Sequence, residues 1–173
     1  MADEFSNQAH VEKVDALFST IAMRYDLVND IQSAGLHRLW KRKMARLVAL
    51  GESEQALDVC CGTGDLIVRL AKRGGRVAGL DMNGAMLNVA RRRLAECNID
   101  QARLYQADAL QLPFGDGQFD VVTIAYGLRN LADYKTGLQE IFKVLKPGGR
   151  LAILDFGKPP NRFVRGLYYQ YLR

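Results

Sequence analysis

A glycine turn between two apolar strands constrains the fold of this chain more than any other feature. Residues 57–65 read Leu-Asp-Val-Cys-Cys-Gly-Thr-Gly-Asp, and a second apolar strand, residues 76–80, is followed by Asp81. Gly62 and Gly64 allow a sharp turn and a close approach to a ligand, because neither carries a Cβ. A carboxylate at the tip of the neighbouring strand can accept hydrogen bonds from ribose hydroxyls. The pattern therefore predicts an α/β enzyme that binds a nucleoside.

The spacing of the glycines decides between kinds of nucleotide loop. A dinucleotide fingerprint needs a third glycine where Ile67 stands, and a triphosphate loop needs Gly-Lys-Ser or Gly-Lys-Thr, which the chain lacks. What remains is an acidic residue, Asp58, followed by Cys60, Gly62 and Gly64. This spacing resembles the S-adenosylmethionine loop of class I methyltransferases, with Cys60 in place of the first glycine. The loop alone could equally be a structural turn, and Asp81 favours a cofactor.

Length and composition indicate one soluble domain. The chain has 173 residues, of which 49% are hydrophobic, so it can bury a sizeable core. It begins with no secretory signal, and no apolar run approaches about 18 residues. We therefore expect a cytoplasmic protein. The three cysteines include no C-x-x-C pair and only two histidines accompany them, so we expect neither a metal site nor a disulfide framework.

The net charge of +5 is unevenly distributed. Residues 36–46 carry five Lys or Arg and no acid, and residues 158–173 carry Lys158, Arg162, Arg165 and Arg173, again with no acid. Both segments are candidates for contact with an anionic surface, either lipid headgroups or nucleic acid phosphates. A solvated charged face is the ordinary explanation.

From position 56 onward, apolar runs alternate with segments of helical periodicity, which is typical of a parallel sheet covered by helices. Asp133 is a candidate N-cap, and Pro147 with Gly148 predicts a turn into the last strand. The predicted strands are 56–60, 76–80, 102–106, 119–124 and 150–155, and the predicted helices are 65–73, 84–97 and 133–145.

Residues 8–50 are predicted to be helical and to precede the sheet. Five apolar residues recur there at helical spacing and are expected to face the core, with Arg38, Arg42 and Arg46 on another face. These apolar residues are Leu36, Leu39, Trp40, Leu47 and Val48. We divide the chain into an N-terminal helical substrate or cap segment, 1–50, and a Rossmann-like cofactor-binding domain, 51–173.

Two further segments resemble one known family. Residues 25–30 and 33–41 are similar to the first signature of the ubiquinone/menaquinone biosynthesis C-methyltransferases, and residues 126–130, Tyr-Gly-Leu-Arg-Asn, are similar to the second. Residues 145–150 and 154–159 also fit. The glycine loop itself is more similar to that of demethylmenaquinone methyltransferases. Members of the family often carry Glu where Asp155 stands and Ser where Ala125 stands.

The resemblance implies a class I S-adenosylmethionine-dependent methyltransferase fold, an α/β sheet with helices on both faces. Enzymes of this class add two strands after the fifth, so we expect the C-terminal strands to be missing and the fifth strand to form an exposed edge. The implied reaction is transfer of a methyl group from S-adenosylmethionine to a ring carbon of a polyprenylated quinol. Demethylmenaquinol is the expected acceptor, and a benzoquinol of the ubiquinone branch is the alternative. A peripheral contact with the inner face of the cytoplasmic membrane and a homo-oligomer are further expectations, and no nucleic acid partner is expected.

The resemblance also assigns roles to particular residues. The cofactor would be held by the glycine loop, the acidic strand tips and their neighbours: Asp58, Gly62, Thr63, Gly64, Asp81, Met82, Asp108, Ala109 and Ala125. Catalytic roles fall on Arg129, Asn130 and Tyr126, which follow the fourth strand. Arg129 would stabilise the developing quinolate or hold a water that takes the proton, unless it only forms an ion pair with Asp133 or Asp155. His37 is a further candidate for substrate contact.

Two other classes of function share these features. A class I methyltransferase acting on RNA or on a small soluble acceptor would use the same loop, and its basic segments would bind phosphates. Methylation of RNA and indifference to quinols would distinguish it. A non-catalytic binding or scaffold subunit would be distinguished by failure to bind S-adenosylmethionine.

Overall fold

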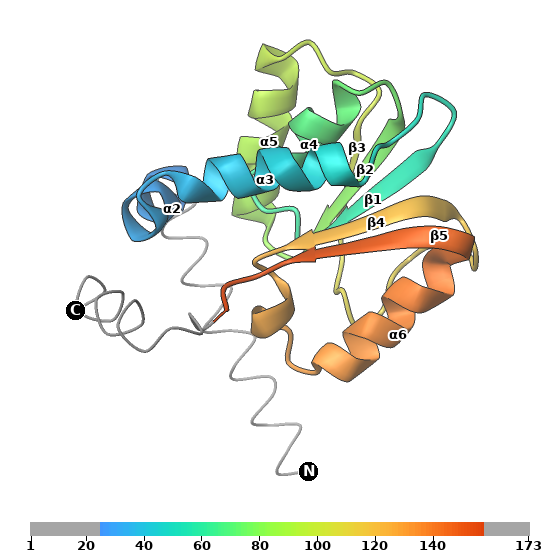
Figure 1. The fold of residues 1–173 in the computed structure, drawn as a ribbon. Coiled ribbons are helices and arrows are strands. Elements are labelled where there is room, and N and C mark those ends of the chain that lie inside the picture. Colours follow the sequence, from blue (N-terminus) through green and yellow to red (C-terminus); the bar gives the residue numbers. More distant parts are fainter. Residues whose placement is uncertain (1–24, 158–173) are drawn as a thin grey trace.

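A computed structural model gives the fold of residues 25–157. Their centre is a five-stranded sheet with helices on both faces (Figure 1). The strand order is β3-β2-β1-β4-β5, and every neighbouring pair is parallel. The strands are β1 (Gln55–Val59), β2 (Arg76–Asp81), β3 (Arg103–Gln106), β4 (Phe119–Ala125) and β5 (Leu145–Leu154). The expected α/β sheet is confirmed.

The order of the strands places a crevice at the centre of the sheet. The chain passes outward from β1 to β3 and then returns to the other side of β1 as β4. Loops that leave β1 and β4 at their carboxyl ends therefore diverge, and ligands of open α/β sheets bind at such a switch point.

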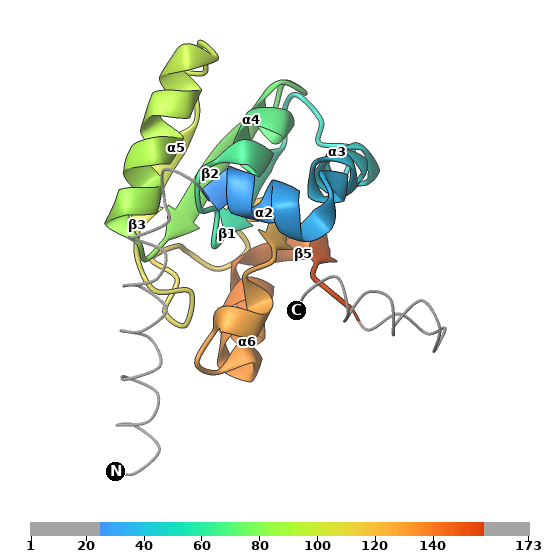
Figure 2. The same cartoon turned by 90° about the vertical axis from the view of Figure 1, so that its left-hand side faces the viewer.

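Helices cover the two faces unequally. Helices α3 (Leu36–Leu47), α4 (Asp65–Ala71) and α5 (Gly84–Glu96) lie on one face, and α6 (Tyr134–Val144) lies on the other, as Figures 1 and 2 show. Helix α2 (Tyr25–Ser33) precedes α3, and a short 3-10 turn, η2 (Leu128–Asn130), precedes α6. The predicted N-cap of α6 is confirmed, because the Asp133 side chain accepts a hydrogen bond from the backbone N–H of Lys135.

The sheet separates two apolar layers, since successive side chains of a strand point to opposite faces. Ala56 of β1 and Val121 of β4 join the layer that α3, α4 and α5 cover. Leu57, Val59 and Ile124 join the layer that α6 covers. Strands β1 and β4 are thus buried on both faces, which makes their carboxyl ends a rigid base for the loops above them.

The last strand begins earlier than predicted. Leu145 already pairs with Phe119 of β4, and after an irregularity the pairing resumes at Val121 and Arg150. The predicted turn at Pro147 and Gly148 is therefore a bulge within β5, where Gly148 adopts a φ of 79°. A proline is tolerated there because β5 is the edge strand of the sheet that residues 25–157 form.

The prediction for the face of α3 that packs on the core was wrong, apart from Val48, which is buried at the end of the helix. The other predicted core residues, Leu36, Leu39, Trp40 and Leu47, are 37% to 73% exposed. The buried stripe contains His37, Lys41, Met44 and Ala45. These residues have helical spacing, but two are polar and are accommodated by partners that the local sequence does not reveal.

Two further features of the chain concern its surface and its ends. No helix within residues 25–157 has the length and apolarity needed to cross a membrane. The predicted helical residues 8–24 and the second basic segment, with Lys158, Arg162, Arg165 and Arg173, lie outside the described residues.

Candidate functional site

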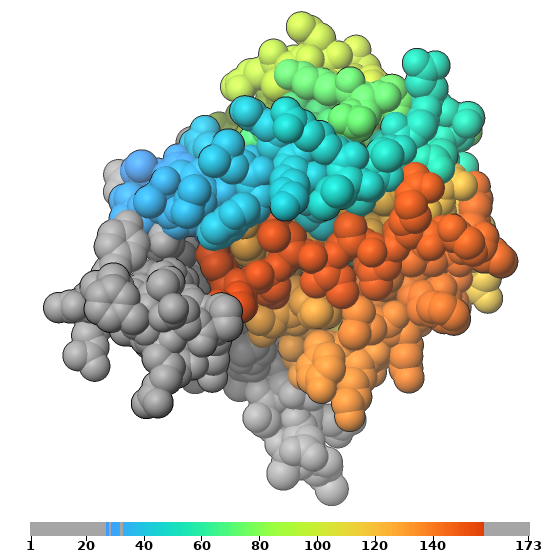
Figure 3. Space-filling view, in the orientation of Figure 1, coloured from blue at the N-terminus to red at the C-terminus, as the bar shows by residue number. Residues whose placement is uncertain are grey.

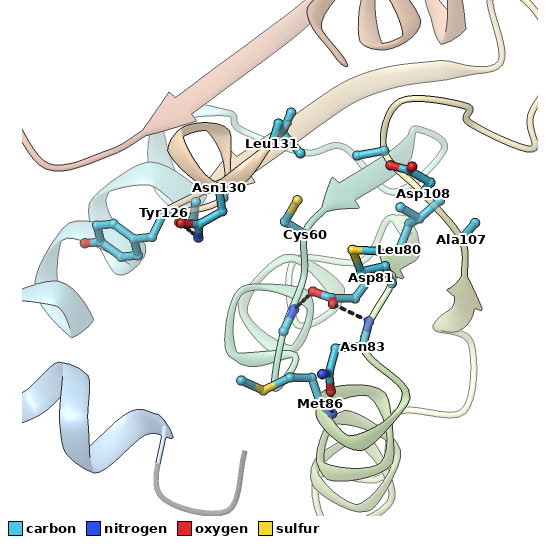
Figure 4. Close-up of a pocket in the computed structure, with 15 residues that line it drawn as sticks. Cys60, Leu80, Asp81, Asn83, Met86, Ala107, Asp108, Tyr126, Asn130 and Leu131 are labelled. Carbon is cyan, nitrogen blue, oxygen red and sulfur yellow. Dashed lines mark hydrogen bonds between the residues drawn. The ribbon is translucent and has the colours of Figure 1, made fainter. Parts of the chain in front are cut away.

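A pocket opens at the carboxyl ends of β1, β2, β3 and β4, at the predicted crevice (Figure 4). The space that its walls outline is about 660 Å³ and includes the mouth that is open to solvent. Eight of the residues predicted for the site line it: Gly62, Asp81, Met82, Asp108, Ala109, Ala125, Tyr126 and Asn130. The structure thus brings the strand tips into one cavity.

Asp81 is fixed at the pocket wall by two backbone hydrogen bonds. Its Oδ2 accepts from the N–H of Gly62 at 2.8 Å, and its Oδ1 accepts from the N–H of Asn83 at 2.9 Å (Figure 4). The Asn83 side chain in turn caps α5 by accepting from the N–H of Met86. A carboxylate oxygen has more than one acceptor site, so this pre-positioned group can also receive ribose hydroxyls.

The two glycines of the loop are needed for different physical reasons. Both have a positive φ, 53° at Gly62 and 75° at Gly64, which disfavours any residue with a Cβ. A Cβ on Gly62 would meet no protein atom within 4 Å, whereas one on Gly64 would lie 3.0 Å from Cβ of Ala90 on α5. Gly62 therefore leaves space open at the pocket, and Gly64 allows α5 to pack against the loop.

The segment that follows β3 forms the neighbouring part of the wall. Asp108 and Ala109 both line the pocket, and Oδ1 of Asp108 accepts a hydrogen bond from the N–H of Leu110 at 2.9 Å. The N–H of Ala107 donates to the carbonyl of Asp81, which joins the ends of β2 and β3. The two acidic side chains thus lie on adjacent strand ends, as Figure 4 shows.

Asp58, Thr63 and Gly64 were also expected to hold the cofactor, but they do not line the pocket. Asp58 is buried within the sheet and accepts a hydrogen bond from Oγ1 of Thr123 on β4 at 2.7 Å. Burial raises the pKa of Asp58 to about 7, although the bond from Thr123 opposes this shift. Thr63 is buried too and accepts a hydrogen bond from Arg93 at 3.1 Å. Both side chains are thus buried and make hydrogen bonds within the fold.

The end of β4 has an unusual backbone. Tyr126 has a φ of 62°, a conformation that is rare for an aromatic residue and is found at functional sites. Its N–H donates to the carbonyl of Leu154, and its carbonyl accepts from Nδ2 of Asn130 at 3.2 Å. A Cβ on Gly127 would lie 2.4 Å from Cβ of Cys60, so only glycine allows this turn to approach the loop after β1.

Arg129 does not line the pocket. Its guanidinium forms a 2.6 Å ion pair with Asp155, beyond the end of β5, and lies 4.9 Å from the ring centroid of Phe156. The Tyr126 ring stacks on Phe156 at 4.7 Å. Of the two ion-pair partners considered from the sequence, Asp155 is the observed one, because Asp133 caps α6 instead. The side chain of Arg129 remains 45% exposed.

Seven residues that line the pocket were not assigned to it from the sequence: Cys60, Leu80, Asn83, Met86, Ala107, Gly127 and Leu131. Asn83 was recognisable as a cap residue shortly after the acidic strand tip. The apolar members carried no signal, since their spacing is that of ordinary core residues. Burial raises the pKa of the Cys60 thiol well above its usual value.

His37, a candidate for substrate contact, is buried in α3. Its Nδ1 lies 3.0 Å from Oγ of Ser33 and 3.6 Å from Asp30. Burial and the charge of Lys41 lower its pKa. The His37 ring therefore packs against residues of α2 and does not line the pocket.

The sheet order, the glycine loop and the acidic strand tips together define the fold of the class I S-adenosylmethionine-dependent methyltransferases. Comparison with known protein families agrees with this assignment of the fold. The chain belongs to the ubiE/COQ5 methyltransferase family, whose model matches residues 6–173. Family and fold both support S-adenosylmethionine as the cofactor.

Two curated relatives share a name. The chain is 45% identical to "Ubiquinone/menaquinone biosynthesis C-methyltransferase UbiE" of Azotobacter vinelandii over 163 residues, and 43% identical to the protein of that name from Pseudomonas fluorescens over 164 residues. Each alignment covers 92% of this chain and 64% of the relative. The chain thus spans less than two thirds of the length of these relatives.

Solved structures show the same fold. A SAM-dependent methyltransferase from Aquifex aeolicus matches with a TM-score of 0.66 and 23% identity, covering 78% of this chain and 79% of that one. The YcgJ protein from Bacillus subtilis matches with a TM-score of 0.65 and 26% identity, covering 70% of this chain and 52% of that one.

Proposed function

We propose that this chain, as a member of its family, takes part in S-adenosylmethionine-dependent C-methylation of a polyprenylated quinol. The observation that carries the proposal is the pocket in which Asp81, fixed by the N–H groups of Gly62 and Asn83, faces an open glycine loop. The relatives' name, which refers to ubiquinone and menaquinone biosynthesis, supports the acceptor class.

The residues present fit the cofactor. The open space above Gly62 allows a ligand to approach the loop, and the Asp81 carboxylate lies where ribose hydroxyls can donate to it. Asp108 and the backbone of Ala109, at the neighbouring strand end, suit the adenine edge. When bound, S-adenosylmethionine supplies an electrophilic methyl group on a sulfonium.

The acceptor needs a site for developing negative charge. A ring carbon becomes nucleophilic when a hydroquinone hydroxyl loses its proton and its charge spreads into the ring. Arg129 lies next to the pocket residue Tyr126, with its charge 5.9 Å from that ring centroid, and is suited to stabilise the quinolate. A guanidinium is too strongly protonated to act as the base itself. Asn130, which lines the pocket, is suited to orient the ring.

A lipid-linked acceptor also requires access to a membrane. The exposed apolar residues of α2 and α3, with exposed cations on α3, support a peripheral contact with anionic lipid. Figure 3 shows α2 and α3 at the surface beside β5. We further propose that α2 and α3 belong to a cap segment, residues 1–50, and that residues 51–173 bind the cofactor. The cytoplasmic location and a homo-oligomer stay predictions.

The decisive experiment measures transfer of labelled methyl from S-adenosylmethionine to three acceptors in parallel. We expect transfer to demethylmenaquinol, weaker transfer to the benzoquinol of the ubiquinone branch, and none to RNA. Preference for the benzoquinol would retain the reaction class and reverse the branch. Methylation of RNA with indifference to both quinols would overturn the proposed acceptor, and failure to bind S-adenosylmethionine would overturn the proposal as a whole.

A further inference from the structure

Lys41 is a buried lysine that no predicted role uses. It belongs to α3, and only 6% of its surface is exposed. Its Nζ lies 3.5 Å from Oδ2 of Asp65 and 5.9 Å from the ring centroid of Tyr126. Asp65 directly follows the glycine loop, and Tyr126 lines the pocket. The buried ammonium therefore lies between the start of α4 and the turn after β4.

Two cations, Lys41 and Arg69, share the carboxylate of Asp65. Asp65 is shared, since NH2 of Arg69 lies 3.0 Å from its Oδ1. Burial opposes the ionisation of Asp65, yet the charges of Lys41, Arg69 and Arg93 outweigh it and lower its pKa. Burial raises the pKa of Asp58, another nearby acid, to about 7.

An anionic group on a ligand would add to the compensation of the Lys41 charge, because a buried ammonium is costly unless anions compensate it. If ribose and adenine lie at Asp81 and Asp108, the amino-acid part of the cofactor extends toward the other end of the pocket. There the loop faces Tyr126 and Asn130, as Figure 4 shows. The α-carboxylate is the anionic group that this part of the cofactor carries.

We propose that Lys41 recognises the α-carboxylate of the cofactor, an inference that rests on the proposed function. Lys41 does not itself line the pocket. Its flexible four-carbon stem allows the ammonium to be shared between Asp65 and a carboxylate that enters beside Tyr126. Arg69 remains on Asp65, so the acid keeps a partner when Lys41 turns toward the ligand. The N-terminal helical segment thereby contributes directly to cofactor selectivity.

The test compares two ligands that differ only in the carboxylate. Calorimetry measures the affinity for S-adenosylhomocysteine and for its decarboxylated analogue in the wild type and in Lys41→Met, which keeps the length and removes the charge. We expect Lys41→Met to lose about tenfold to a hundredfold in affinity for S-adenosylhomocysteine. The decarboxylated analogue should bind both proteins within about twofold.

Two variants separate recognition from a structural effect. Lys72→Met makes the same substitution at an exposed lysine at the end of α4 and should leave both affinities unchanged. Lys41→Arg keeps the charge and should retain most of the preference for the carboxylate. An equal loss for both ligands in Lys41→Met, or no loss, would overturn the inference while leaving the proposed function intact. A wild type that binds neither ligand would overturn the proposed function and the inference together.

Discussion

The carboxylate of Asp155 accepts a hydrogen bond from the guanidinium of Arg129 at 2.6 Å and so joins the end of β5 to the turn after β4. The same oxygen accepts from the backbone N–H of Phe156 at 2.8 Å, whose ring lies beneath the guanidinium. Arg129 is thus held beside the pocket by an ion pair and an aromatic face.

Replacing Arg129 by alanine should affect turnover much more than cofactor affinity, because ribose and adenine have Asp81 and Asp108. Loss of a group that stabilises charge only as the quinolate forms should lower kcat by about 10²-fold or more. Arg129→Lys keeps the charge but loses the planar fork, so it should also be impaired. The measurements are kcat for demethylmenaquinol and the Kd for S-adenosylmethionine.

Asp155 provides the matched comparison for that experiment. Asp155→Asn removes the charge that holds the guanidinium, whereas Asp155→Glu retains it and should keep more of the activity. Near-normal turnover in Arg129→Ala, or a loss confined to cofactor binding, would leave Arg129 as a structural ion-pair residue.

Asp81→Ala should weaken cofactor binding by at least 1.5 to 3 kcal/mol, roughly tenfold to a hundredfold, because charge-assisted hydrogen bonds are lost. The same carboxylate holds the N–H groups of Gly62 and Asn83, so the loop should also loosen. Calorimetry with S-adenosylhomocysteine and with an analogue that lacks both ribose hydroxyls separates these effects. The loss of affinity that is due to the ribose contact should appear in Asp81→Ala only with S-adenosylhomocysteine.

Asp116→Ala supplies the control for this variant. Asp116 is an exposed acid in the loop between β3 and β4 and does not line the cofactor pocket. Its removal should leave both affinities unchanged. Equal affinity of Asp81→Ala and the wild type for S-adenosylhomocysteine, in a folded protein, would rule out a ribose contact.

The sequence predicted the parts of the site that depend on local pattern. The apolar runs, the positive-φ glycines and the acidic strand tips lie within short segments, and parallel strands must bring their carboxyl ends to one edge. Asp81 and Asp108 were therefore expected at adjacent strand ends, and the structure has them there. Asp133 was likewise recognisable as a cap from its place before the helix.

Features that depend on distant partners could not be predicted in this way. Lys41 and His37 occupy the buried stripe of α3 because Asp65 and Ser33 meet them there. A prediction from apolar spacing places polar residues such as these at the surface and leucines in the core. On α3 the structure shows the reverse for both groups. The choice of Asp155 over Asp133 as the partner of Arg129 likewise follows from the packing of β5 beside β4.

The buried carboxyl of Asp58 should make stability depend on pH. Its pKa in the folded state is about 7, raised by burial from 3.8, so the folded chain holds a proton that the unfolded chain releases at a lower pH. Its contribution to the free energy of unfolding is therefore greatest below about pH 4. The contribution falls as the pH rises from about 4 to about 7, and it is constant above that range. The full change should be on the order of a few kcal/mol.

Asp58→Asn should remove this dependence, because an amide does not titrate and its oxygen can still accept from Thr123. Urea unfolding at pH 4.5 and pH 7.5 measures the effect, and the stability of the variant relative to the wild type should rise between them. Asp116→Asn, at an exposed acid, controls for the change of net charge. A relative stability that does not change between the two pH values would show that Asp58 is already ionised at pH 4.5.

The exposed side of α3 should bind anionic membranes. Arg42, Lys43 and Arg46 are exposed there, next to apolar side chains that remain in contact with solvent. These apolar residues are Leu36, Leu39, Trp40 and Leu47 on α3, with Leu27 and Ile31 on α2. Cations interleaved with apolar side chains suit the headgroup region, and each cation near an anionic surface contributes about 1 kcal/mol. Co-sedimentation with vesicles should therefore increase with anionic lipid and decrease with salt.

Arg42→Glu with Arg46→Glu should weaken this binding by about tenfold or more, because two attractive charges become repulsive. Arg76→Glu with Arg91→Glu makes the same change of net charge at exposed residues of β2 and α5 and should retain more binding. Equal losses in the two double variants would mean that net charge alone drives association. Equal binding of the wild type to neutral and anionic vesicles, or no binding, would remove α3 as a membrane contact. The second basic segment, which includes Arg162, Arg165 and neighbouring aromatic residues, would then be the remaining candidate in the sequence.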